Sequence, residues 1–169
     1  MDGCLNYNQR AVKAKPGFSE GWGNIGFVHL QRGEVEEAIK AIEFDNVTTV
    51  QIIYNIFRQR PHEYFFKKAA QKNVGIIVRV PLASGLLTGK FSKNSAFEAG
   101  DHRNFNRHGE MFDKGETFSG IPFELGVDAV EKLKAIVPAN MTLTEMALKW
   151  ILMNPEVSCI IPGASKVDQ

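Results

Sequence analysis

The chain has 169 residues, 44% hydrophobic and 23% charged, which suits one ordinary globular domain with a small appendage and not a disordered tail. The formal net charge of +1 offers no basic field for nucleic acid. Cys4 and Cys159 stand far apart, without a CxxC motif or clustered histidines, which argues against a zinc site or a disulfide framework and favours a reducing, cytoplasmic setting. A signal-peptide pattern and a run of eighteen apolar residues are both missing from the sequence, so we expect neither secretion nor a membrane span.

Residues 1–44 have a helical pattern and form the first of two expected domains. Small and apolar residues recur there as in a helix–turn–helix unit: Ala11, Pro16, Trp22, Ile25, Gly26, Gly33, Ala38 and Ile42. This pattern resembles the end of one tetratricopeptide repeat and the body of the next, with Gly26 and Ala38 at a close contact between helices. Because so few repeats cannot bury a face alone, the segment would be a fragment or a docking piece. Residues 35–43 would serve equally well as a helix of a β/α protein.

Residues 45–169 form the second expected domain, in which strands alternate with helices. Runs of β-branched residues predict strands at 47–53, 74–80 and 157–161. The second strand shows no polar alternation, so we expect it to be covered on both faces. Between the first two strands, Pro61 opens a helix that continues to about Lys72, where Asn73 can end it.

The second half of this domain begins with residues 91–120, which have no steady period and predict a long surface loop. An apolar stripe then predicts a helix from Phe123 to Val137, ended by Pro138. Thr142 and Glu145 fit a capping box at the start of another helix. Three strands separated by helices imply a parallel sheet or part of a barrel.

Two of the strands are followed by similar loops, Pro81–Lys90 and Pro162–Lys166. Each begins with proline, continues with small residues and reaches a lysine. Gly85 and Gly89 let the backbone approach a ligand closely, and the hydroxyls and lysines offer hydrogen-bond donors and positive charge. In β/α barrels such loops build the ligand site, and phosphate commonly binds to the last two of them. The loops therefore predict a site for an anionic ligand at one rim of the sheet.

Three segments, residues 50–55, 81–90 and 161–165 with Gln169 four positions on, resemble the C-terminal half of an aldo-keto reductase in order and spacing. The resemblance implies an α/β fold class: a partial (β/α)8 TIM barrel, with strands resembling the sixth to eighth and their helices, after an N-terminal helical hairpin. It also implies NADP(H) as the cofactor and a small-molecule carbonyl as the substrate. The family has no glycine-rich Rossmann loop, so the lack of GxGxxG does not count against it.

The resemblance assigns cofactor roles to residues of all three segments. It places Gln51 at the nicotinamide carboxamide, and Arg103 in a loop that folds over the cofactor. The pyrophosphate would follow one loop, which Lys90 closes: Pro81, Leu82, Ala83 and Ser84. The adenosine 2′-phosphate would be held by the last loop, with help from its lysine: Gly163, Ser165, Lys166 and Gln169. Structural alternatives are a polar strand end for Gln51, a solvated charge for Arg103 and a helix-end cation for Lys90.

Position 79 departs from the family pattern. The resemblance implies an aromatic ring there that stacks on the nicotinamide, whereas this chain has Arg79. A guanidinium plane can also stack, but it places positive charge beside a ring that is cationic when oxidised. Arg79 would therefore favour the reduced cofactor.

The family's catalytic residues find no match. The resemblance implies a tyrosine acid tuned by a lysine and assisted by a histidine and an aspartate, all on the first four strands, which this chain does not match. Tyr7, Tyr54 and Tyr64 are the only tyrosines, and none fits the acid role. We assign no catalytic residue and no metal ligand, leave open whether the chain is an enzyme, and expect no carbonyl reduction by it alone.

Two other functions stay open: a non-catalytic module that binds NADP, and a protein-interaction fragment in which the helical segment docks on a partner. Half a barrel exposes strand edges and an uncovered interior. We therefore expect a homo-oligomer, a complementary half supplied from elsewhere, or strands rearranged into a flatter parallel sheet.

Overall fold

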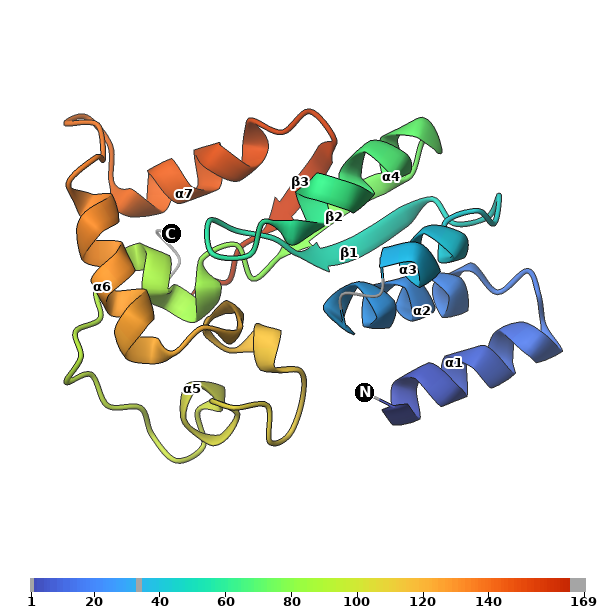
Figure 1. The fold of residues 1–169 in the computed structure, drawn as a ribbon, viewed down its shortest axis with the longest axis horizontal. Coiled ribbons are helices and arrows are strands. Elements are labelled where there is room, and N and C mark those ends of the chain that lie inside the picture. Colours follow the sequence, from blue (N-terminus) through green and yellow to red (C-terminus); the bar gives the residue numbers. More distant parts are fainter. Residues whose placement is uncertain (1, 33–34, 165–169) are drawn as a thin grey trace. The chain divides into compact units, whose positions relative to one another are not determined.

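A computed structural model describes residues 2–32 and 35–164 (Figure 1). The helices are α1 (Asp2–Ala14), α2 (Ser19–Arg32), α3 (Val35–Ala41), α4 (Lys67–Gln71), α5 (His102–Phe105), α6 (Phe123–Lys134) and α7 (Leu143–Leu152). The strands are β1 (Thr49–Ile53), β2 (Gly75–Arg79) and β3 (Val157–Ile161). A π-helical turn, His62–Phe66, runs into α4, and short 3-10 turns lie at Ala83–Thr88, Lys114–Glu116 and Phe118–Gly120. In the described part of the chain, no helix is both long and apolar enough to cross a bilayer.

The chain divides into two compact units. The first comprises Met1–Ile52, Gln59–Val78 and Pro155–Cys159, and so holds α1–α4 and most of the sheet. The second comprises Ile53–Arg58, Arg79–Asn154 and Ile160–Gln169, and so holds the last residues of each strand, the segments that follow them, and α5–α7. The expected boundary near residue 45 stays a prediction.

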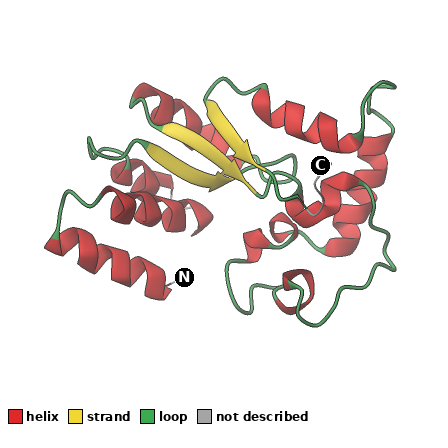
Figure 2. Cartoon of the chain, turned by 180° about the vertical axis from the view of Figure 1, so that it is seen from behind, coloured by secondary structure: helices red, strands yellow, loops and turns green. Residues whose placement is uncertain are grey.

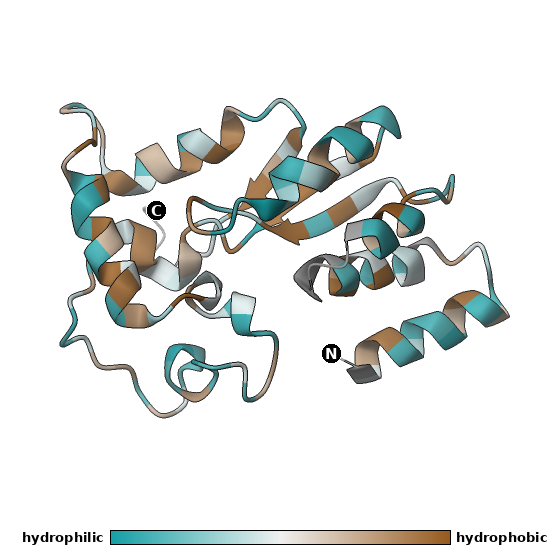
Figure 3. Ribbon diagram, viewed as in Figure 1, coloured by the Kyte–Doolittle hydropathy of each residue, from teal (hydrophilic) through white to brown (hydrophobic). Residues whose placement is uncertain are grey.

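The sheet has the order β1-β2-β3, and its three arrows point the same way (Figure 2). Burial along β2 alternates, with Ile76 and Val78 fully buried and Ile77 half-buried. The expectation that this strand is covered on both faces therefore holds fully for one face and in part for the other, because a β-branched run favours a strand without fixing how completely each face is covered. Strand β3 is largely hydrophobic (Figure 3), and its last residue, Ile161, is half exposed. This edge of the sheet therefore carries apolar surface that no other part of the described chain covers.

The N-terminal helices pack in sequence, α1 on α2 and α2 on α3. Gly26 permits the second contact, since a Cβ there would lie 3.1 Å from Ala41 Cβ and 3.6 Å from the Ala38 carbonyl oxygen. The expected close approach at Gly26 and Ala38 is thus confirmed. Trp22 stacks on Phe44 with ring centroids 3.7 Å apart and donates its indole N–H to the Pro16 carbonyl at 2.9 Å.

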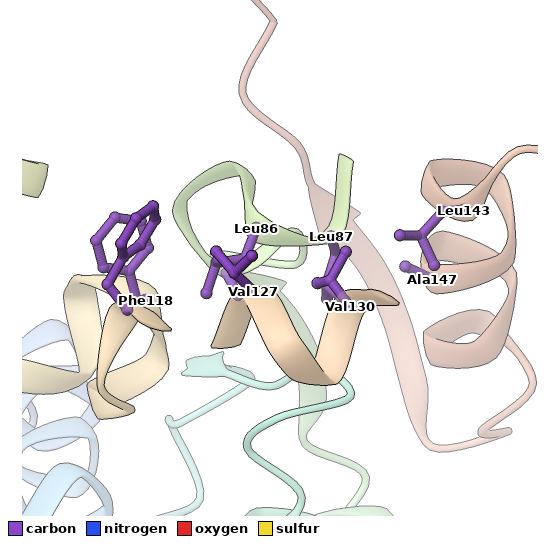
Figure 4. Close-up of a cluster of buried hydrophobic side chains, with 9 residues drawn as sticks. Leu86, Leu87, Phe118, Val127, Val130, Leu143 and Ala147 are labelled. Atoms are coloured by element: carbon purple, nitrogen blue, oxygen red, sulfur yellow. The ribbon is translucent and has the colours of Figure 1, made fainter. Parts of the chain in front are cut away.

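The second unit has its own hydrophobic core, formed by α6, α7 and the turns at residues 83–88 and 118–120 (Figure 4). The core residues are Ala83, Leu86, Leu87, Phe118, Phe123, Val127, Val130, Leu143 and Ala147. Helix α7 begins as expected, because the Thr142 hydroxyl accepts from the Glu145 N–H at 3.2 Å and the Glu145 carboxylate accepts from the Thr142 N–H at 2.7 Å. The core therefore anchors the loop that leaves β2.

Candidate functional site

The residues that follow β1 and β2 meet a distant segment in what we call the exit-loop cluster, defined as Asn55, Arg79–Gly85 and Asp113–Gly120. All of them belong to the second unit. The cluster contains five of the residues assigned to the cofactor by the sequence: Arg79, Pro81, Leu82, Ala83 and Ser84. Its third segment lies within the long region that has no periodic pattern.

Asn55 joins the three parts of this cluster. Its side chain is fully buried, and its amide Nδ2 donates to the Val80 carbonyl at 2.9 Å and to the Ser119 hydroxyl at 2.7 Å. Its Oδ1 accepts from the Phe57 N–H at 3.0 Å. A buried amide with three partners fixes the loops against one another, because each bond lost would leave a polar group unpaired.

Ser84 makes a second link between the loops. Its Oγ donates to the Glu116 carbonyl at 2.9 Å and accepts from the Phe118 N–H at 3.0 Å. The hydroxyl proton that was expected to face a pyrophosphate is thus used inside the protein. A ligand here would meet the backbone of this loop more readily than the Ser84 hydroxyl.

Both loops contain consecutive residues with left-handed backbone. The φ angles are 49° at Ala83, 55° at Ser84 and 96° at Gly85 in one loop, and 50°, 58° and 80° over residues 118–120 in the other. Val80 also has a positive φ, of 51°, which is unusual for a β-branched residue. Such backbone strain persists only where surrounding contacts impose it, and it is concentrated at ligand sites and active sites.

Arg79 and Glu116 form a bidentate ion pair in this cluster. Arg79 Nη1 lies 2.6 Å from Glu116 Oε1, and Nη2 lies 2.9 Å from Oε2. Arg58 belongs to the same charge group, since any side chain at Gly115 would collide with its guanidinium. Burial lowers the pKa of Arg58, while the negative charges of Asp113 and Glu116 oppose that shift. Two guanidinium groups thus face two carboxylates.

Arg103 is held at the start of α5, beside the loop that follows β2. Its Nε lies 2.9 Å from Asp101 Oδ1, and its guanidinium carbon lies 4.8 Å from the centre of the Phe97 ring. These hydrogen bonds lower the pKa of Asp101 from 3.8 to about 2. A Cβ at Gly85 would lie 3.8 Å from Arg103 Nη1. Two segments that the sequence assigns separately to the cofactor therefore adjoin each other.

The other assigned residues are more scattered. Gln51 is an exposed residue of β1 and belongs to the first unit. Lys90 is exposed after the turn at Ala83–Thr88, and Gly163 is exposed beyond β3. Ser165, Lys166 and Gln169 lie outside the described residues. Among the residues described, no group of three or more His, Cys, Asp or Glu is placed to hold a metal ion.

Sequence reasoning missed Glu116 and Asp101 as site residues, and it gave no role to Asn55. Asn55 ends one of the segments that carry the resemblance, so its position was a usable signal. Asp101 could have been found as a helix N-cap two residues before Arg103, because aspartate is favoured there. Glu116 has no local signal, since its partner Arg79 is 37 residues away.

A cavity of about 650 Å³ lies in the first unit, between α1, α2 and the segment from α3 to Phe44. Trp22, Ile25 and Phe44 form its apolar part, and Lys13, His29 and Lys40 are among its polar residues. None of the described residues that are assigned to the cofactor lines it. We therefore do not place the cofactor there.

Comparison with known proteins identifies the family. Residues 23–169 match the family model described as aldo/keto reductase family. The chain belongs to the aldo/keto reductase family. The match begins inside the segment that was interpreted as repeat-like, so α2 and α3 from residue 23 onward are part of the aldo/keto reductase match. A tetratricopeptide-like character of the preceding residues stays a prediction.

The relatives agree with this assignment. The chain is 29% identical over 157 residues to a probable voltage-gated potassium channel subunit beta from Arabidopsis thaliana, covering 88% of this chain and 44% of that protein. It is 26% identical over 149 residues to the aldo-keto reductase yakc [NADP(+)] of Schizosaccharomyces pombe, covering 86% and 41%. The chain thus spans less than half the length of these relatives.

Solved structures support the fold. The glycerol dehydrogenase AKR11B4 from Gluconobacter oxydans matches with a TM-score of 0.52 and 19% identity, over 82% of this chain and 44% of that one. The holo form of aldo-keto reductase AKR11C1 from Bacillus halodurans matches with a TM-score of 0.50 and 23% identity, over 77% and 36%. At these identities the likeness concerns the fold alone.

Proposed function

We propose that this chain carries the cofactor-binding part of an aldo-keto reductase site, that its cofactor is NADP(H), and that it does not reduce carbonyls alone. One observation carries the proposal: Arg103, from the long loop, lies beside Gly85 in the loop after β2. A cation beside a glycine-containing turn is a suitable place for a phosphate, because backbone and charge approach the ligand together.

The residues present are compatible with such a cofactor. The loop Pro81–Gly85 would follow the pyrophosphate with its backbone, and Lys90 and Arg103 would supply positive charge on either side of it. The ion pair with Asp101 holds the Arg103 guanidinium in place and neutralises part of its positive charge. Gly163 is exposed, and a side chain added there would meet no atom within 4 Å, which leaves room for the adenosine 2′-phosphate end.

In this proposal the reaction itself needs an acid that the tyrosines of this chain do not supply. NADPH supplies a hydride to a carbonyl carbon, and a proton must reach the carbonyl oxygen from an acid. Tyr54 is unsuited to that role, since it is buried and stacked on Trp150 with ring centroids 5.2 Å apart. Tyr7 and Tyr64 are exposed residues of helices in the first unit. A small carbonyl compound would therefore be reduced only where a tuned acid comes from elsewhere.

A protein-interaction role is the second candidate, because a relative is named a potassium channel subunit beta. The half-exposed apolar residue Ile161 on edge strand β3 favours association with another chain or another copy. Both described cysteines are free, which is compatible with the cytoplasmic setting that we propose.

Titration of the purified chain with NADPH tests the first proposal, with nicotinamide and tryptophan fluorescence as the signals. We expect saturable binding that Lys90→Glu weakens at least about fivefold, because a nearby attractive charge becomes repulsive. Lys132→Glu is the matched control, since Lys132 is an exposed lysine of α6 and should leave the affinity within about twofold.

Hydride transfer is measured in the same preparation as loss of NADPH absorbance with a panel of aldehydes. Turnover by the chain alone would contradict the proposed inactivity. Failure of wild type to bind NADPH would contradict the cofactor role and leave the interaction role. Light scattering tests the interaction role by measuring whether the mass of the isolated chain in solution exceeds that of one copy.

A further inference from the structure

The ion pair between Arg79 and Glu116 is bidentate, which leaves its hydrogen bonds in the plane of the guanidinium group. The two distances, 2.6 and 2.9 Å, join the two guanidinium nitrogens Nη1 and Nη2 to the two carboxylate oxygens. Such an end-on pair is planar, and guanidinium hydrogen bonds lie in the plane of the group, so they do not use its faces. The side chains are only 32% and 16% exposed, which limits screening by solvent.

Glu116 is not a chance partner on a mobile surface. Its own carbonyl accepts a hydrogen bond from Ser84, and Ser84 in turn accepts from the Phe118 N–H. The backbone around Glu116 is therefore tied to the loop that leaves β2, the strand that ends at Arg79. The same link keeps the carboxylate near Arg79 whenever both loops hold their positions.

The charges in this group balance. Arg79 and Arg58 contribute two positive charges, and Glu116 and Asp113 contribute two negative charges. Removing the Glu116 charge would leave one guanidinium uncompensated at the end of β2. An oxidised nicotinamide ring is cationic and would be repelled by that charge, whereas the reduced ring is neutral and would not.

We infer that Glu116 neutralises Arg79, so that the planar pair replaces the missing aromatic ring as a flat surface without net charge. Glu116 then sets the preference between oxidised and reduced cofactor and is a specificity-determining residue. The inference rests on the proposed cofactor function. It differs from the expectation, based on Arg79 alone, that the site favours the reduced form, and the test below distinguishes the two.

The test is the ratio of the dissociation constants for NADP+ and NADPH, measured by calorimetry at low salt. In Glu116→Gln we expect this ratio to rise at least about fivefold, which corresponds to Coulomb repulsion between unit charges about 4 Å apart in water. The rise should disappear in Arg79→Gln/Glu116→Gln, where both charges are removed. Glu124→Gln, at an exposed position of α6, removes an equal charge and should leave the ratio unchanged.

Arg79→Gln provides a second, independent variant in case Glu116→Gln does not fold, with near-ultraviolet circular dichroism as the folding check. It leaves a net negative charge, so the ratio should fall at least about twofold. An unchanged ratio in both single variants, or an equal change in Glu124→Gln, would overturn the inference while leaving the cofactor role standing. Wild type that binds neither form would overturn both.

Discussion

Asn55 joins the three parts of the exit-loop cluster, and its replacement by alanine should lower the stability of the chain. The substitution removes the bonds to the Val80 carbonyl, the Ser119 hydroxyl and the Phe57 N–H. With about 1 kcal/mol for each bond, the expected loss is about 3 kcal/mol of unfolding free energy. Asn55→Asp should lose more unfolding free energy at about pH 7 than at about pH 4. Only the protonated acid can donate a hydrogen bond to the Val80 carbonyl or the Ser119 hydroxyl, which both accept from Asn55 in wild type.

Urea unfolding followed by Trp150 fluorescence measures this loss, since Trp150 stacks on the neighbouring Tyr54. A Trp22→Phe background removes the other tryptophan signal. Asn104→Ala is the matched control: Asn104 is exposed, its two bonds are both 3.3 Å long, and its loss should be below about 0.5 kcal/mol. The reasoning is refuted if the two alanine variants differ by less than about 1 kcal/mol.

Three further predictions concern the same unit. Since the pKa of Asp101 is lowered, the stability that this carboxylate contributes is complete above pH 4 and is lost as the pH falls toward 2. The urea midpoint of Asp101→Asn should therefore fall less than that of wild type between about pH 5 and pH 2. Thr142→Ala should cost about 1 kcal/mol through the lost cap, measured by thermal unfolding against Thr144→Ala. Gly126→Ala should lower the free energy of unfolding, measured in urea, by about 1 kcal/mol. The added Cβ would lie 2.7 Å from Cδ1 of the buried Leu86, and this overlap outweighs the gain in helix propensity. A variant more stable than wild type would contradict the packing argument.

Local elements were predictable because their signals lie within a few residues of sequence. The box of Thr142 and Glu145 fixed the start of α7, and the β-branched run at 157–161 coincides with β3. Asn73 does end the helix before β2, with a left-handed φ of 56° that asparagine tolerates. In the region 91–120 the absence of a period predicted a loop, yet α5 and two 3-10 turns form there; aspartates cap α5 and the turn Lys114–Glu116.

Long-range charge pairing was not predictable. From the sequence, only the positive charge of Arg79 beside the nicotinamide was considered, because its partner Glu116 is 37 residues away and lies in a segment without a periodic pattern. Ser84 was singled out as a cofactor residue, which stays a prediction, and the hydrogen bonds of its hydroxyl join the backbone of residues 116 and 118. A sequence pattern can thus indicate which loop is special without showing which atoms face a ligand.

The contacts that shape the exit-loop cluster lie within the second unit. The bonds from Asn55 to Ser119, from Ser84 to Glu116 and from Arg79 to Glu116 all lie within the second unit, so the strained turns at residues 83–85 and 118–120 have stabilising partners in that same unit. Their conformation therefore does not require the residues that would supply a proton to a substrate. Under the proposed function, cofactor binding and carbonyl reduction are then separable properties: we propose that the first depends on this cluster and the second on an acid outside it. Loss of catalysis would leave the loops' shape intact, whereas loss of Asn55 would disturb it.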